Sequence, residues 1–386
     1  MTKFLLVLVF LSLAFSACGQ AATIGPTATA PSTETSVSTE TATPLPSPSP
    51  TNPPTLSYPS GGLGPANFPA GVDPLTGLKV ANPALLQRRP LLIKVSNLPR
   101  SVRPQWGLSF ADIVFEYYTE EGSTRFAAIF YGNDASMVGP IRSGRFIDGY
   151  LVDGYKAMFA FGSAYIAELD RFNNSDFANR MVVEEPYTPL KRYDPNGLNY
   201  LVVSTTDLSA YATKRGLNTV QNLNNMFFNL PAPAGGQPGT QVFVHYSAAT
   251  YSRWDYDPAS GKYLRFSDNA NVTEVGQTEQ YLPLTDRLTN QQLAFDNVGI
   301  LYANHKLYSP GIYDIQLTGS GDALAFRDGQ AYKVQWHRNA TDVVSLTNPD
   351  GSPFAFKPGT TCFEVIGLAS TVTQTGTSWR FIQQMP

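Results

Sequence analysis

The chain has few histidines and few cysteines for its length. Only 3 His and 2 Cys occur among 386 residues. The histidines stand alone at positions 245, 305 and 337, without the short spacing of a zinc-binding motif. We therefore expect no metal site and no cofactor. Two cysteines allow one disulfide at most, which excludes a disulfide-stapled scaffold.

Charged side chains are also scarce, at 15% of the chain, and neither sign dominates. Lys and Arg total 27 against 30 Asp and Glu, a net charge of −3. Without a basic excess to neutralise phosphates, general nucleic-acid binding is excluded as a main function. A hydrophobic content of 42% is too low for a multi-pass membrane protein, whereas 12% aromatic residues favour β-rich structure.

The first 17 residues have the three parts of a secretory signal peptide. Lys3 supplies the positive start, residues 4–15 form an apolar run too short to span a bilayer, and small residues precede Cys18. A cysteine directly after small residues is typical of bacterial lipoproteins, whose thiol is lipidated before cleavage. We predict a lipid anchor at Cys18 that holds the protein on the extracytoplasmic face of the cell membrane. An ordinary signal peptide with an incidental cysteine is the alternative.

Residues 18–71 are predicted to form a disordered stalk. Of the 30 prolines, 11 lie between residues 19 and 70, with abundant Ser and Thr and with Glu34 and Glu40 as the only charges. Such a segment buries too little apolar surface to offset the entropy of ordering. At about 3.1 Å per residue for Pro-rich chain, the stalk reaches on the order of 100 Å. Its composition also fits a glycosylated stalk.

The remaining chain is predicted to fold as α+β. Residues 72–230 mix signals for helices with signals for strands, including an antiparallel hairpin of residues 111–118 with 126–131. A Pro- and Gly-rich stretch at residues 231–239 then suggests a boundary. Short β runs separated by turns dominate residues 240–386, which predicts a smaller, mostly antiparallel β domain.

The hairpin carries the first candidate for chemistry. Alternation along the strand places Glu116 on the face of Val114, as one acid in an aromatic surface. Such surroundings disfavour the charged carboxylate and suit a proton donor, as in glycan cleavage by an acid. Glu116, with Glu121 as a second acid, is therefore a candidate catalytic residue. Structural pairing of Glu116 with Arg125 or Arg142 is the alternative.

Arg142 and Arg145 lie in a Gly-flanked loop at the start of a predicted helix. Exposed backbone N–H groups and two guanidinium groups suit a carboxylate or phosphate on a ligand. Arg125 and Asp112 complete the predicted ligand-binding set. Pairing of Arg145 with Asp148, three residues away, is the structural alternative.

Several ordered motifs resemble the YerB-like family of bacterial lipoproteins. They are Asp73-Pro74-Leu75-Thr76-Gly77-Leu78, Arg88-Arg89-Pro90, Arg103-Pro104-Gln105-Trp106-Gly107-Leu108, Ala111-Asp112-Ile113-Val114-Phe115-Glu116, Glu121-Gly122-Ser123-Thr124-Arg125-Phe126 and Val138-Gly139-Pro140-Ile141-Arg142-Ser143-Gly144-Arg145. The likeness covers nearly all of residues 72–368. It implies an N-terminal region that carries these motifs and a β-rich C-terminal region, in a family without an assigned function. Histidines that members usually carry near Phe161 and after Pro195 are absent here.

These features predict a binding or accessory role at the cell envelope, with cell-wall glycan or an envelope protein as partner. The alternative is an enzyme that cleaves the glycan strands of peptidoglycan by carboxylate acid/base chemistry, with Glu116 or Glu121 in that role. A purely structural spacer is a third possibility.

Overall fold

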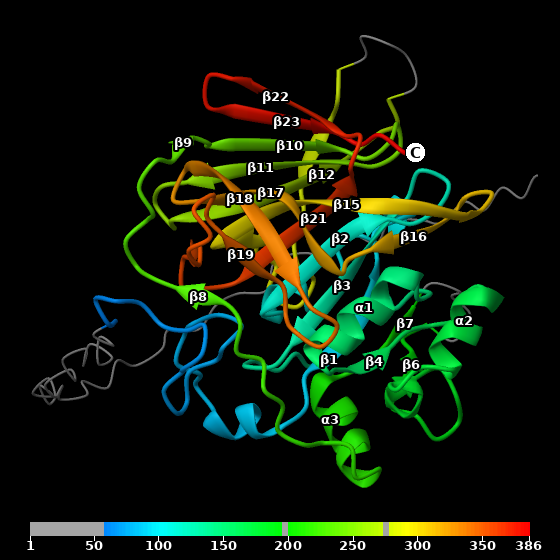
Figure 1. Cartoon of the computed structure of the whole chain (residues 1–386). Helices are drawn as coiled ribbons and strands as arrows, with labels where there is room; N and C mark the ends of the chain where they lie inside the picture. Colours follow the sequence, from blue (N-terminus) through cyan, green and yellow to red (C-terminus); the bar gives the residue numbers. More distant parts are fainter. Residues whose placement is uncertain (1–57, 195–199, 273–277) are drawn as a thin grey trace, which may run out of the picture. The chain divides into compact units, whose positions relative to one another are not determined.

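The computed structural model describes residues 58–194, 200–272 and 278–386 (Figure 1). The predicted signal peptide, Cys18 and the stalk as far as residue 57 lie outside the described residues. The predicted stalk extended to residue 71, and that end is wrong. Leu63 is buried and pairs with Phe228 through two backbone hydrogen bonds of 2.8 Å, so the folded unit already includes this segment.

A twelve-stranded sheet forms the centre of the molecule. Across the sheet its strands are β19 (Ser345–Thr347), β18 (Gln330–Arg338), β17 (Gly319–Arg327), β15 (Asn297–Ser309), β21 (Thr361–Gly367), β2 (Ile113–Tyr118), β3 (Thr124–Phe130), β1 (Leu91–Ser96), β4 (Met158–Ala160) and β5 (Met181–Val182), with β16 (Ile312–Gln316) beside β15 and β9 (Gln237–Pro238) beside β18. β2 and β3 form an antiparallel hairpin where the sequence predicted one.

The central sheet crosses the boundary that the sequence suggested. β2 precedes residues 231–239 and β21 follows them, yet the two strands pair in parallel, with Ile113 opposite Thr361. The Pro- and Gly-rich stretch therefore does not separate two sheets. The class is α+β with strands in the majority, and the two predicted regions share one sheet.

A second sheet of seven strands contains only residues after 240. Its order is β13 (Tyr281–Pro283), β12 (Lys262–Asp268), β11 (Tyr251–Asp257), β10 (Gln241–His245), β23 (Ser378–Ile382) and β22 (Thr371–Thr375), with β14 (Ala294–Phe295) beside β12. Two small sheets pair β20 (Ala355–Phe356) with β8 (Phe227–Phe228) and β6 (Lys191–Arg192) with β7 (Leu201–Val202).

Helices are short and few in the described residues. They are α1 (Phe146–Tyr155), α2 (Ile166–Asn173), α3 (Thr205–Lys214) and the 3-10 turns η1 (Pro83–Gln87), η2 (Arg100–Val102), η3 (Leu108–Phe110) and η4 (Ala178–Arg180). None of the described helices has both the length and the apolar character needed to cross a bilayer.

The central sheet is covered on both faces, and side-chain alternation along β2 shows why. Phe115 and Tyr117 belong to a core that includes Leu151 of α1, whereas Val114 belongs to a second core that includes Trp254 of β11. The molecule therefore has three layers, with the seven-stranded sheet on one face of the central sheet and α1 on the other (Figure 1).

A buried ionic bridge joins the two large sheets. Glu116 of β2 and Glu364 of β21 are neighbours in the parallel register, and Arg265 of β12 lies between their carboxylates. Arg265 Nη2 donates to Glu116 Oε2 at 2.5 Å, and Nη1 donates to Glu364 Oε1. The side chains of both glutamates are 0% exposed and that of Arg265 is 2% exposed. We call these three residues the ionic bridge.

Neutral donors complete the shell of the ionic bridge. Asn97 Nδ2 at 2.9 Å and Thr124 Oγ1 at 2.6 Å donate to Glu116 Oε1. Trp254 Nε1 donates to Glu364 Oε1 at 2.8 Å. The Tyr246 hydroxyl donates to Glu364 Oε2 at 3.0 Å. Every carboxylate oxygen of the bridge is therefore hydrogen-bonded.

The electrostatics of the ionic bridge follow from one cation between two acids. Burial raises the pKa of Glu116 to about 7, with Arg265 opposing this shift and Glu364 adding to it. Burial disfavours the charged form of Arg265, but the two carboxylates outweigh it and raise its pKa. Glu116 therefore loses its negative charge toward Arg265 as the pH falls through neutrality.

The ionic bridge predicts a large loss of stability in Arg265→Met. The substitution leaves two adjacent buried carboxyl groups without their cation, which costs about 3–5 kcal/mol in the free energy of unfolding. Urea denaturation at pH 7 measures the loss. In the triple variant Glu116→Leu/Arg265→Met/Glu364→Leu part of the stability returns, because no buried charge remains.

Arg253→Met is the matched control. Arg253 lies on the neighbouring strand β11 and pairs with Asp255, but its side chain is 25% exposed. A pair that water reaches contributes about 1 kcal/mol or less. Equal losses in Arg253→Met and Arg265→Met would contradict the structural role of the bridge.

Candidate functional site

The candidate site lies where three strands of the central sheet end. β1 runs parallel to β4, and both β1 and β2 run antiparallel to β3, so β1, β2 and β4 point the same way. Loops that follow the carboxyl ends of such strands are the usual place for ligands in sheets covered by helices. At this edge the loop between β3 and α1 is hydrogen-bonded to the end of β1 and to the segment after β4. The turn after β2, this loop and the segment after β4 bring together an arginine cluster, which we define as Glu120, Arg125, Arg142, Arg145 and Glu168.

Glu120, in the turn of the β2–β3 hairpin, is the acid at the centre of this cluster. Arg125 Nη2 donates to its Oε1 at 2.5 Å, and Arg145 donates from Nε to Oε2 at 2.7 Å and from Nη2 to Oε1. Burial works against ionisation of Glu120, but the hydrogen bond from Arg145 and the charge of Arg125 outweigh it and lower its pKa. Burial lowers the pKa of Arg125 to about 10, and the positive charge of Arg145 adds to this effect.

Arg145 is fixed by its position at the start of α1. Its backbone N–H donates to Asp148 Oδ2 at 2.6 Å, which is a capping interaction for the first turn of the helix. Its guanidinium also lies 3.6 Å from Glu168 Oε2. The predicted pairing with Asp148 therefore occurs through the backbone of Arg145, while its guanidinium forms an ion pair with Glu120.

Arg142 is the arginine of the cluster with spare donors. Its Nε donates to Ser96 Oγ at 3.3 Å, and its side chain is half-buried. Among the residues that the structure describes, Arg142 has no ion pair, and its two terminal amino groups have no hydrogen-bond partner. The hydroxyl groups of Ser143 and Ser163, 3.0 Å apart, flank the same loop. This geometry suits a carboxylate or phosphate, which a guanidinium binds through two parallel hydrogen bonds.

A buried lysine lies beneath the arginine cluster, and the sequence analysis missed it. Lys94 of β1 contacts the hydroxyl of Tyr117 and lies 3.2 Å from Asp148 Oδ1, and all three residues are 0% exposed. We call Lys94, Tyr117 and Asp148 the buried triad. The available signal was a lysine in the middle of the apolar run Leu91–Val95, because such strands rarely bury an unpaired charge.

The other predicted site residues lie elsewhere. Glu116 belongs to the ionic bridge and is fully buried. Glu121 is exposed in the hairpin turn, with a positive φ of 51°. Asp112 lies at the opposite end of β2, about 20 Å away along the strand. The structure thus brings together Arg125, Arg142 and Arg145 of the predicted set, and it separates Glu116 and Asp112 from them. Glu121 follows Glu120 in the hairpin turn but is exposed.

Asp112 has a local structural role. Its Oδ2 accepts the backbone N–H groups of Tyr131 and Gly132 at 2.5 and 3.0 Å, and its Oδ1 accepts Asn133 Nδ2 at 3.1 Å. Burial raises the pKa of Asp112 to about 6 despite these hydrogen bonds. Asp112 therefore holds the loop that follows β3.

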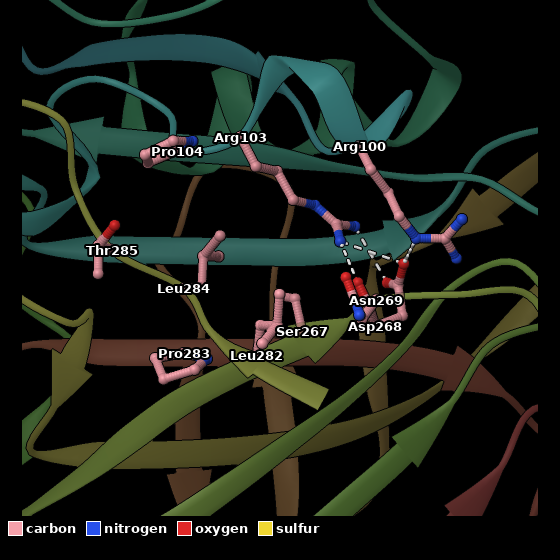
Figure 2. Close-up of a pocket in the computed structure, with 10 residues that line it drawn as sticks. All are labelled: Arg100, Arg103, Pro104, Ser267, Asp268, Asn269, Leu282, Pro283, Leu284 and Thr285. Carbon is pink, nitrogen blue, oxygen red and sulfur yellow. Dashed lines mark hydrogen bonds and ion pairs between the residues drawn. The ribbon is translucent and has the colours of Figure 1, made fainter. Parts of the chain in front are cut away.

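A groove of about 230 Å³ near η2 and β13 contains two further arginines (Figure 2). Figure 2 shows Arg100 and Arg103 directed at Asp268, and Asp268 Oδ2 accepts Arg100 Nε at 2.6 Å while Oδ1 accepts Arg103 Nη2 at 3.0 Å. Arg103 Nε also donates to Asn97 Oδ1 at 3.0 Å. These arginines are occupied by protein partners, so the groove has less capacity for an anion than the arginine cluster.

The Glu120 contacts predict a pH-dependent contribution to stability. Because the pKa of Glu120 is lowered from 4.5 in the folded protein, its ion pairs stabilise the fold above that pH and lose their effect as the pH falls. We expect Glu120→Gln to lower the free energy of unfolding by about 1 kcal/mol at pH 7, a value reduced for partial exposure. Urea denaturation should show this difference shrinking at pH 4. The adjacent variant Glu121→Gln is the control, and an equal effect there would contradict the assignment.

Comparisons with known proteins place the chain in a family. Residues 75–218 match the family model described as "Protein of unknown function (DUF3048) N-terminal domain", and residues 242–362 match the corresponding C-terminal domain. A Bacillus subtilis (strain 168) protein named "Putative lipoprotein YerB" is 29% identical over 311 residues, which cover 76% of this chain and 85% of that protein. The crystal structure of YerB from Bacillus subtilis superposes with a TM-score of 0.64 and 26% identity, over 76% of this chain and 96% of that one. The resemblance seen in the sequence motifs is confirmed, and the chain belongs to the YerB-like family of DUF3048 proteins.

Proposed function

We propose that this protein is a lipoprotein anchored at Cys18 on the extracytoplasmic face of the cell membrane, where it binds cell-wall glycan through the arginine cluster. The signal-peptide pattern, the small residues before Cys18 and the name of the Bacillus subtilis relative support the anchor. The Pro-rich residues 19–57 supply enough chain for the folded unit to reach away from the membrane surface.

The observation that carries the binding role is the pair of unpartnered amino groups on Arg142. Protein acids already engage Arg125 and Arg145, whereas Arg142 is partly exposed and, among the described residues, its guanidinium donates to Ser96 Oγ alone. Wall glycan carries carboxylates on its stem peptides and on the lactyl groups of muramyl residues that have no stem peptide. A carboxylate bound at Arg142 would accept hydrogen bonds from its two terminal amino groups. The hydroxyls of Ser143 and Ser163, which flank the same loop, would bind a neighbouring oxygen.

Glycan cleavage has less support than glycan binding. Glu116 is fully buried with both carboxylate oxygens hydrogen-bonded, so a sugar could reach it only if the two large sheets separated. Glu121 is exposed at a turn and has no resolved ion pair in the described residues. A carboxylate that cleaves glycans needs a substrate-accessible site and a second carboxyl group at a defined distance.

The binding role predicts that Arg142→Gln reduces retention on purified wall sacculi. We expect the detergent-solubilised full chain to bind about tenfold or more weakly, because one charge-assisted contact contributes about 1.5–3 kcal/mol. Cosedimentation with sacculi measures the dissociation constant. Arg215→Gln, at the exposed end of α3, removes the same charge from a residue that is not part of the arginine cluster and should bind like the wild type.

Two outcomes would contradict this role. Equal weakening by Arg142→Gln and Arg215→Gln would indicate a general charge effect. Absence of any retention on sacculi, combined with capture of a particular envelope protein in an Arg142-dependent way, would replace glycan by a protein partner.

The anchor predicts a second measurable change. In Cys18→Ser no thiol is available for acylation, so the protein should move from the membrane fraction to the soluble extracytoplasmic fraction and lose incorporation of an alkyne-labelled fatty acid. Cys362→Ser is the control, because Cys362 is buried in β21. Retention of the fatty-acid label in Cys18→Ser would contradict the anchor.

A further inference from the structure

The buried triad joins the central sheet to the first turn of α1. Lys94 comes from β1, Tyr117 from β2 and Asp148 from α1, and none of the three is exposed to solvent. Lys94 Nζ lies 3.2 Å from Asp148 Oδ1. The Tyr117 hydroxyl is hydrogen-bonded to both of these atoms. An amine, a phenol and a carboxyl group therefore lie in contact, shielded from solvent, at the centre of the fold.

The lysine of the triad is a potential nucleophile. Burial lowers the pKa of Lys94 to about 7, and the opposing charge of Asp148 only partly offsets this, while Arg125 and Arg145 lower it further. A substantial fraction of Lys94 is therefore the neutral amine near neutral pH. Neutral amines held in apolar sites are the form in which lysine attacks carbonyl carbons.

The carboxyl group of Asp148 is held as the acyl donor. Its Oδ2 accepts the backbone N–H of Arg145 at 2.6 Å, at the N-terminus of α1, which polarises that oxygen as a carbonyl. Its Oδ1 accepts the Tyr117 hydroxyl instead. The two oxygens therefore have different surroundings, and Oδ1 is the one placed to receive a proton and leave.

We propose that Lys94 and Asp148 form an intramolecular isopeptide bond in the folded protein, with Tyr117 as a proton relay. The Nζ–Cγ bond forms and the Cγ–Oδ1 bond breaks. Oδ1 leaves as water with two protons that the Lys94–Asp148 pair supplies, of which the one from Nζ that accompanies bond formation passes through the Tyr117 hydroxyl. Tyr117 ends unchanged, Oδ2 remains as the amide oxygen, and no oxidant or reductant takes part.

The fold supplies the driving force for this reaction. Fixed contact between the two groups gives the effective concentration of an intramolecular reaction. The product exchanges a buried ion pair, whose desolvation is costly, for a neutral amide. The amide would also attach the first turn of α1 to β1 and so hold Arg145 in the arginine cluster. With Cys18 predicted to carry lipid, Cys362 has no partner for a disulfide, and this bond would supply the covalent link that an extracytoplasmic protein otherwise lacks.

Peptide mapping of the purified full chain tests the proposal. Trypsin does not cut after an acylated lysine, so the bond joins residues 89–100, uncut at Lys94, to residues 146–156. We expect this branched peptide at one water less than the summed masses of its two parts, with fragmentation placing the link at Asp148 and not at Asp153. Recovery of residues 89–94 and 146–156 only as separate, unmodified peptides from the folded protein would overturn the proposal.

Variants separate the roles within the triad. Tyr117→Phe keeps the ring in the core but removes the relay, so circular dichroism should show a folded protein and peptide mapping should show loss of the branched peptide. Asp148→Asn should form the same branched peptide with release of ammonia in place of water. Asp153→Asn, in the same tryptic peptide, is the control and should remain linked. Wild-type amounts of branched peptide in folded Tyr117→Phe would refute the relay.

Discussion

The buried guanidinium of Arg265 between two glutamates is the interaction on which the arrangement of the large sheets depends. Glu116 and Glu364 come from distant parts of the chain, and the parallel pairing of β2 with β21 places them side by side. Two such carboxylates need a cation, and that cation belongs to β12 of the seven-stranded sheet. A shift of either strand by one residue would turn its glutamate to the opposite face and leave Arg265 with one partner. The ionic bridge thus couples strand register to the stacking of the sheets, in the way that buried polar groups specify one packing.

The partners of the arginines distinguish residues that hold the fold from residues available to a ligand. Arg265 is buried between acids, and Arg100 and Arg103 share Asp268. Arg125 and Arg145 share Glu120, which fixes the loop before α1 against the hairpin. Arg142 is held on this rigid frame, and its two terminal amino groups have no hydrogen-bond partner among the described residues. A ligand would therefore meet a cation whose position is already set, which limits the entropy lost on binding.

Local patterns predicted the local parts of this structure. The alternation of side chains along the strand predicted the β2–β3 hairpin and the face on which Glu116 lies. The Gly-flanked loop predicted that Arg142 and Arg145 lie at the start of α1. The partner of Glu116 was beyond such reasoning, because Arg265 is 149 positions away and meets it only through sheet stacking. The pairing of β2 with β21 is equally non-local, so the Pro- and Gly-rich stretch looked like a domain boundary. The buried triad was missed because a lysine is normally read as exposed, and its partners come from β2 and α1.

The central claim is that Glu116 is a structural carboxylate and that ligand binding belongs to Arg142. NMR of the protein labelled at the glutamate carboxyl and arginine side-chain positions, titrated with soluble wall glycan fragments, tests both parts at once. The account predicts that the Arg142 Nε signal shifts with added glycan, while the Glu116 carboxyl signal does not move and titrates near pH 7 with and without ligand. A Glu116 signal that follows the glycan concentration while Arg142 stays unchanged would contradict the account.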